Sequence, residues 1–435
     1  MSLGISIAWM SPVIPKLMSN NTDINPLGEA ISTLQVSLIP VLLFSSTTLT
    51  YPLWAKVVDR IGRRTTLRLL AVILLFSLTT TAFANHYYIY CVTLAGTGSS
   101  VAGSMLSASL YINEISEDSY RGTLGCLLGL QIPLGLLYGF VCGALFNVRV
   151  FTLLCAAPAV IHLILSPFIP ESPVYLITNH KRIEAVAALK KLGRTLDKSV
   201  TDMENEIVKA TTSPNQKCFF EIFKNSNTRK AFFLASQMFV IEQFSGISII
   251  LAYVVTIIDN SQSTLTGNAV SIIIGLVKVA TYLISLYLID RIGRRKLILT
   301  SSFLCIFPIF FMGVYSYLSH IKSHAFDNLG WLLVTFVIFY VMAYSIGLGT
   351  VPMTFAGEVF PDDFRATGVA LVLGIDQILA CAISFSYPNL AELWGSHWCF
   401  WVCSFVTTIG FINMFFTVPE TKGKSFAEIQ KMLSK

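Results

Sequence analysis

Three charged side chains stand near the middle of long apolar runs of this chain, where they could bind a polar solute. They are Glu242, Lys278 and Asp376. A charged residue at the centre of a membrane-spanning helix costs about 2.5 to 3.5 kcal/mol on insertion scales, so each needs a partner or water. Glu242 and Lys278 could form a buried ion pair that fixes helix packing, or they could contact a solute directly. The residues alone leave both interpretations open.

Small and polar residues accompany Lys278 at helical spacing. Ser271, Gly275, Tyr282 and Ser285 would share one face of a helix with it. Such a stripe is expected of a helix that lines a cavity.

The composition shows which elements must position these side chains. Of the 435 residues, 54% are hydrophobic and 12% are charged, and the mean hydropathy is +0.68. An average soluble domain carries about 25% charged residues, so the chain is neither a soluble enzyme nor a disordered protein. The apolar runs do not alternate as the strands of a β-barrel do. The nine cysteines fit neither a disulfide framework nor a metal site, and we predict no catalytic residues, no metal and no cofactor.

Apolar runs of about 20 residues, long enough to cross the hydrocarbon of a bilayer, recur along almost the whole chain. They predict an all-α membrane protein with twelve transmembrane helices. The expected spans are 1–18, 34–57, 67–84, 90–112, 123–146, 150–169, 231–256, 268–289, 297–318, 330–352, 367–388 and 398–418. The first span begins at Met1 and is barely long enough to cross the bilayer, which indicates a truncated or poorly anchored amino end.

The basic residues indicate the sidedness. When successive connections are assigned alternately, 26 of the 30 Lys and Arg residues fall on one side. The positive-inside rule places that side in the cytoplasm, together with both termini and the central segment. The net charge of +6 then reflects topology, and no nucleic-acid partner is predicted. Asn20 begins the sequon Asn-Asn-Thr on the opposite side, and we predict that it is glycosylated.

A polar segment at 178–229 separates two groups of six spans. Within it, residues 180–192 place Ile183, Val186, Ala187 and Leu189 on one face, and Gly193 could end the helix. Short amphipathic cytoplasmic helices fit this pattern, and a solvated linker with partial helicity is the alternative.

Three motifs occur twice in the same order. Asp-Arg-Ile-Gly-Arg-Arg at 59–64 recurs at 290–295, Glu114 with Arg121 recurs as Glu358 with Arg365, and Pro-Glu-Ser-Pro at 170–173 is echoed by Pro-Glu-Thr-Lys at 419–422. This repetition predicts two homologous, parallel six-helix halves, as in transporters that rock about a central site. The expected organisation is an amino-terminal half at 1–177, a linker at 178–229, a carboxy-terminal half at 230–418 and a tail at 419–435.

The motifs resemble those of the sugar porter family of the major facilitator superfamily, over essentially the whole chain. Residues 242–248 are similar to its Gln-Gln-x-Ser-Gly-x-Asn signature, and residues 419–423 match its Pro-Glu-Thr-Lys-Gly ending. Within the family, residues 345–349 are most similar to the insect facilitated trehalose transporter group. The resemblance implies a transporter and not an enzyme. It would carry a neutral sugar, trehalose or a hexose, passively by alternating access across the plasma membrane.

The resemblance also implies two sets of functional residues. The substrate-binding positions are Glu242, Gln243, Ser248, Tyr253, Lys278, Met353 and Asp376. The cytoplasmic gate positions, which would pair across the two halves when that side is closed, are Asp59, Arg63, Arg64, Glu114, Arg121, Glu171, Asp290, Arg294, Arg295, Glu358, Arg365 and Glu420. A role as topology anchors is the alternative for the gate positions. Glu242, Ser248, Lys278 and Asp376 depart from the family's neutral or amide residues.

These departures keep two other functions open. One is a sugar sensor or scaffold that does not transport, and the other is a carrier of a non-sugar or charged solute. Proton-coupled sugar porters carry a carboxylate in the first span, and residues 1–18 contain none. Glu242 and Asp376 nevertheless leave proton coupling open.

Overall fold

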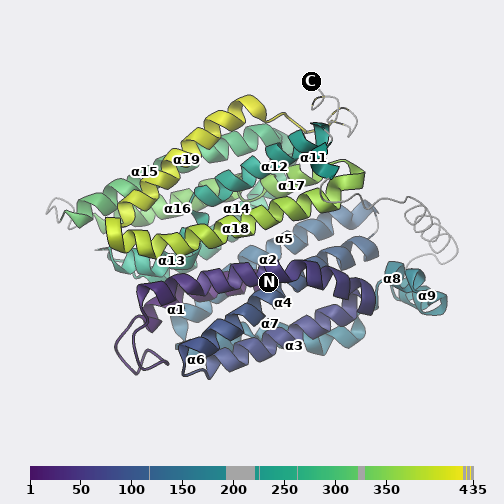
Figure 1. Ribbon diagram of the computed structural model, residues 1–435, viewed down its shortest axis with the longest axis horizontal. Coiled ribbons are helices and arrows are strands. Elements are labelled where there is room, and N and C mark those ends of the chain that lie inside the picture. Colours follow the sequence, from purple (N-terminus) through teal and green to yellow (C-terminus); the bar gives the residue numbers. More distant parts are fainter. Residues whose placement is uncertain are drawn as a thin grey trace.

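A computed structural model describes residues 1–116, 118–192, 221–224, 226–261, 263–321, 329–424, 428 and 432. Within these residues the regular secondary structure is entirely helical. The helices lie side by side in two groups, one drawn in purple to blue and the other in teal to yellow (Figure 1). These groups correspond to the two halves that the repeated motifs predict.

The amino-terminal half contains the first six expected spans. Its helices are α1 (Ser2–Leu17), α2 (Thr33–Ile61), α3 (Arg63–Ala82), α4 (Tyr87–Ile115), α5 (Asp118–Leu145), α6 (Val148–Cys155), α7 (Ala157–Leu165) and the 3₁₀ turn η1 (Ser166–Phe168). The sixth span is divided because Pro158 lacks the amide hydrogen that a continuous helix would need there.

The carboxy-terminal half repeats this plan, with breaks inside the seventh and tenth spans. Its helices are α12 (Ser226–Phe244), α13 (Ile247–Asp259), α14 (Gly267–Ile292), α15 (Arg294–His320), α16 (Gly330–Ile346), α17 (Val351–Val359), α18 (Asp362–Trp394) and α19 (Ser396–Thr417). Gly246, with a φ of +87°, separates α12 from α13 in a left-handed conformation that other residues adopt at a cost. The broken helices expose backbone and side-chain polar groups at mid-membrane depth.

Eleven described helical segments are long and apolar enough to span a membrane. Helix α1 has 16 residues and covers about 24 Å at 1.5 Å per residue, so it falls short of them. It is nevertheless packed between α5 and α13, and Ala8, Met10, Val13, Ile14 and Leu17 are fully buried. Protein contacts therefore hold α1 in place.

The central segment contains three short described helices, α8 (Pro173–Thr178), α9 (Arg182–Lys191) and α11 (Glu221–Lys224). Helix α9 confirms the expected amphipathic helix, but its buried face is formed by Ala185, Ala188 and Leu189. The prediction was wrong for Ile183, which is 88% exposed. Gly193, the expected helix cap, lies outside the described residues.

The two ends of the bundle differ in how the halves meet. We call the end that carries the 18–32 connection the outer end, and the end that carries Gly62 and Gly293 the inner end, following the predicted sidedness. At the outer end, the amide of Val255 donates to Ser11 Oγ at 3.2 Å, and Asn389 Nδ2 donates to Ser37 Oγ at 2.8 Å. These bonds join α13 to α1 and α18 to α2, so the halves are in contact on the outer side.

Candidate functional site

The break between α12 and α13 brings three polar side chains into one hydrogen-bonded chain. Ser248 Oγ donates to Gln243 Oε1 at 2.6 Å, and Gln243 Nε2 donates to Asp376 Oδ1, also at 2.6 Å. The second oxygen of Asp376 accepts from Gln377 Nε2 at 3.1 Å. Gln243 and Asp376 are 6% and 8% exposed, so this chain lies in the interior of the carboxy-terminal half.

Glu242 and Lys278 both meet the side chain of Tyr344 on α16. The Tyr344 hydroxyl donates to Glu242 Oε1 at 2.7 Å, and Lys278 Nζ lies 5.1 Å from the centre of the Tyr344 ring. The ammonium group is thus placed for a cation–π contact. Tyr344 connects the two charges through opposite chemical features, its hydroxyl and its ring.

The direct ion pair between Glu242 and Lys278 is not formed in this structure. No carboxylate oxygen among the described residues lies within 4.0 Å of Lys278 Nζ, and this ammonium makes no hydrogen bond to them. Glu242 Oε2 likewise has no hydrogen bond from a described residue. A donor and an acceptor of opposite charge therefore remain free near one tyrosine, which suits a ligand that has both kinds of hydrogen-bonding group.

Two predicted substrate positions lie away from this cluster. Met353 on α17 is 53% exposed, so its side chain points out of the helix packing. Tyr253 is buried further along α13, where its hydroxyl donates to the carbonyl of Ser384 at 3.0 Å. The structure thus brings together Glu242, Gln243, Ser248, Lys278 and Asp376, and leaves Met353 and Tyr253 outside the cluster.

Three residues of the cluster were not predicted. Gln377 and Tyr344 are described above, and the Tyr340 hydroxyl lies 2.8 Å from Ser245 Oγ at the helix break. Tyr340 and Tyr344 are four residues apart and their rings stack. That spacing places both on one helix face and is a signal that the sequence contains.

The small and polar stripe of α14 has more than one role. Gly275 faces Leu137 of α5 so closely that an added Cβ would lie 2.9 Å from Leu137 Cα, and Tyr282 packs on Gly129 of α5. Ser285 instead donates to the carbonyl of Ile346 at 2.7 Å. Much of the stripe therefore forms the contact between the two halves, and Lys278 is the member that joins the polar cluster.

At the inner end of the amino-terminal half, the first repeated motif forms a compact ionic arrangement. Arg63 binds Glu114, with 2.8 Å from Nη2 to Oε1, and reaches Asp59 at 3.4 Å. Glu171 accepts hydrogen bonds from the amides of Arg63 and Arg64, each at 3.0 Å. These amides begin α3, so Glu171 occupies the position where a helix favours an anion.

The carboxy-terminal half repeats this arrangement atom for atom in most respects. Arg294 Nη2 lies 2.9 Å from Glu358 Oε1, and Glu420 accepts from the amides of Arg294 and Arg295 at 3.0 and 3.2 Å. Arg64 and Arg295 also correspond, because each donates to backbone carbonyls near the end of its half, Ser166 and Phe415 respectively.

One bond of the arrangement is made in a single half. The Ser172 hydroxyl donates to Glu114 Oε2. Its counterpart Thr421 has a buried hydroxyl without a described partner, and so does Glu358 Oε2, the counterpart of the acceptor. The inner end of the carboxy-terminal half is therefore less completely bonded than that of the amino-terminal half.

The described gate residues pair within each half. The side chains of Arg121, Asp290 and Arg365 lie outside the description, so pairing between the halves stays a prediction for these three. In the present conformation, with the outer ends joined, Glu114 and Glu358 are engaged by the arginine of their own half.

Comparison with known proteins gives a consistent result. The profile of the family described as "Sugar (and other) transporter" matches residues 13–433. The facilitated trehalose transporter Tret1-2 homolog of Drosophila simulans is 30% identical over 382 residues, which are 86% of this chain and 77% of the relative. The facilitated trehalose transporter Tret1 of Apis mellifera ligustica is 28% identical over 432 residues, covering 99% and 85% of the two chains.

Solved structures confirm the fold. The inward open conformation of the xylose transporter XylE from E. coli superposes with a TM-score of 0.81 at 18% identity, covering 99% of this chain and 96% of the neighbour. A partially occluded inward open conformation of the same transporter gives a TM-score of 0.77 at 19% identity, covering 98% and 96%. The prediction of a twelve-helix major facilitator fold in two six-helix halves is thereby confirmed.

Proposed function

Because this chain belongs to the sugar (and other) transporter family, we propose that it carries a neutral sugar passively across the plasma membrane, with trehalose or a hexose as substrate. It is a multi-pass membrane transporter and not an enzyme. The observation that carries the proposal is the hydrogen-bonded chain of Ser248, Gln243 and Asp376 at the break of α12 and α13. Amide, hydroxyl and carboxylate groups on a broken helix match the alternating donors and acceptors of a sugar.

Alternating access follows from how the two halves meet. Each half holds its own inner end together with Arg63 and Glu114 or with Arg294 and Glu358, so each can move as one body. The outer contacts at Ser11 and Ser37 break when the halves rock. We propose that Arg121, Asp290 and Arg365 join the gate when the inner side closes, because two states of this kind exchange contacts across an interface.

The transport proposal is tested by uptake in oocytes. Radiolabelled trehalose, glucose, fructose, a polyol, an organic cation and an organic anion are supplied outside at equal concentration. We expect saturable trehalose or hexose uptake that a protonophore leaves unchanged, and we expect Gln243→Ala to reduce it at least tenfold, because the substitution removes an amide and unbalances Asp376. Gly374→Ala is the matched control, since an added Cβ there meets no atom within 4 Å.

Three other outcomes would replace the proposal. Sugar binding without flux in the same membranes would identify a sensor, and uptake of ions in place of sugars would identify a carrier of charged solutes. Collapse of uptake with the protonophore would indicate coupling through Glu242 or Asp376.

The proposed topology makes a separate prediction at Asn20. Asn20 is exposed in the connection between α1 and α2, at the outer end. We expect the protein from animal cells to migrate faster after glycosidase treatment, and Asn20→Gln to abolish the shift. A reporter inserted at residue 200 is the control for sidedness. If it were found outside the cell, the proposed positions of the termini would be reversed.

A further inference from the structure

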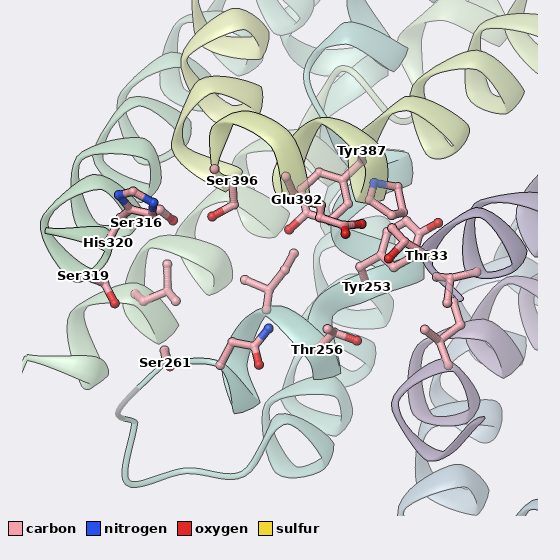
Figure 2. A pocket seen from close by; sticks show the side chains of 18 of the residues that line it. Thr33, Tyr253, Thr256, Ser261, Ser316, Ser319, His320, Tyr387, Glu392 and Ser396 are labelled. Carbon is pink, nitrogen blue, oxygen red and sulfur yellow. The ribbon is translucent and has the colours of Figure 1, made fainter. Parts of the chain in front are cut away.

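A second cavity lies at the outer end, apart from the central polar cluster. It has a volume of about 450 Å³, and helices α13, α15 and α18 form most of its wall (Figure 2). That volume is within the range of small-molecule sites. Thr256 on its wall follows Ser248 of the central cluster by eight residues of the same helix, about 12 Å along the axis. The cavity is therefore separate from the cluster, although one helix serves both.

Aromatic rings line the inner part of this cavity. Tyr253, Tyr315 and Tyr387 are all at least nine-tenths buried. The rings of Tyr253 and Tyr387 are 5.2 Å apart between centroids, and the Tyr253 hydroxyl is engaged by the carbonyl of Ser384. The rings thus contribute apolar faces, which suit the C–H faces of a sugar ring.

A hydroxyl group in the wall lacks a partner. Thr256 Oγ1 is buried, and no described residue forms a hydrogen bond with it. Figure 2 shows Thr256 beneath the cavity, with Ser316 and Ser319 of α15 on another wall. A buried hydroxyl left unbonded is costly, so a ligand with its own hydroxyls would gain by meeting it.

The charges of the cavity select among possible ligands. None of its lining residues is Lys or Arg, so an anion finds no counter-charge. Glu392 and His320 are exposed and stand at the rim, while the buried part is neutral. A rim carboxylate can accept from two neighbouring hydroxyls. A cation would find a single solvated carboxylate, which favours a neutral ligand.

We propose that this cavity is a second, extracellular binding site for a neutral polyhydroxylated molecule such as a sugar. A ligand seated there touches α13, α15 and α18 together, and α13 also carries Ser248 of the central cluster. The site therefore senses outside sugar and influences the helix that handles the transported one. The proposal rests on the proposed function in taking the outer end as extracellular.

Cysteine protection tests the site. Ser319→Cys, on the exposed part of the cavity wall, is labelled from outside with a membrane-impermeant maleimide at increasing trehalose concentrations. Thr264→Cys, exposed in the neighbouring connection but not part of the lining, is the matched control, and the parental chain gives the blank. We expect trehalose to protect residue 319 and not residue 264. Thr256→Val should raise the half-protecting concentration about three- to tenfold, because one hydrogen bond is lost.

A disabled central cluster separates this site from the transport site. Protection of residue 319 should persist in Gln243→Ala, and in the milder Ser248→Ala if the first variant does not reach the surface. Loss of protection in both, or no effect of Thr256→Val, would overturn the second site. Protection by tetramethylammonium in place of trehalose would overturn the ligand class. Absence of labelling from outside would refute the sidedness, and absent uptake with intact protection would refute the proposed function alone.

Discussion

Joint exchange of Glu242→Gln and Lys278→Asn is expected to give a well expressed transporter, while either exchange alone loses most of its surface protein. Each single change leaves one buried charge without its counterpart, which costs about 3 to 5 kcal/mol for a buried pair. Tyr344 transmits this dependence, since it bonds Glu242 at 2.7 Å and faces Lys278 with its ring. Surface biotinylation and sugar uptake measure the two effects separately.

The substrate profile of the double variant separates two roles for the charges. A profile like that of the parent would show that the charges only support packing. A shift toward ordinary hexoses would show that they contact the substrate, because the double variant has the neutral residues of related sugar porters at these positions.

Tyr344→Phe is the matched control, because it keeps the ring beside Lys278 and removes the hydroxyl that binds Glu242. We expect it to cost about 1.5 to 3 kcal/mol, the usual value of a hydrogen bond to a charged group. Single variants that express and transport like the parent would contradict the coupling between Glu242 and Lys278.

Gly62→Ala and Gly293→Ala are expected to lower the thermal stability of the detergent-solubilised transporter by several degrees each. Both glycines have φ above +90°, a conformation that costs other residues about 1 to 2 kcal/mol. An added Cβ would also lie 2.7 Å from Glu171 Oε2 at the first site and 2.6 Å from Glu420 Oε2 at the second. The carboxylate must then leave the first amides of α3 or α15, and charged hydrogen bonds of about 1.5 to 3 kcal/mol are weakened.

Gly125→Ala and Gly357→Ala provide controls in the same bundle. An added Cβ at either meets no atom within 4 Å. Both lie in helices, where alanine is the better helix former, so their melting temperatures should stay level or rise. Equal melting temperatures for all four variants would contradict the role assigned to Glu171 and Glu420.

The sequence was informative wherever a constraint was local or repeated. The apolar runs predicted the spans, and the paired Asp-Arg-Ile-Gly-Arg-Arg motifs predicted the two halves, because each motif marks a helix break that needs glycine. The breaks at Pro158 and Gly246 left signals of the same kind.

Contacts between distant helices were less predictable. Which side chain meets Glu242 depends on how α12 and α16 are rotated about their axes, and that rotation is set by packing along their whole length. The spacing of residues 180–192 failed at Ile183 for a similar reason. Periodicity gives a face, but the neighbouring α8 decides which face is covered.

The ionic arrangement at each inner end has an evolutionary consequence. Each half binds its own glutamates with its own arginines, so a substitution inside one half need not be compensated in the other. The unusual charges Glu242, Lys278 and Asp376 all belong to the carboxy-terminal half. After the ancestral duplication, this copy could diversify its chemistry while the other copy kept its role as a partner. A lineage that adopts a new nutrient would therefore be expected to accumulate its changes in one copy first.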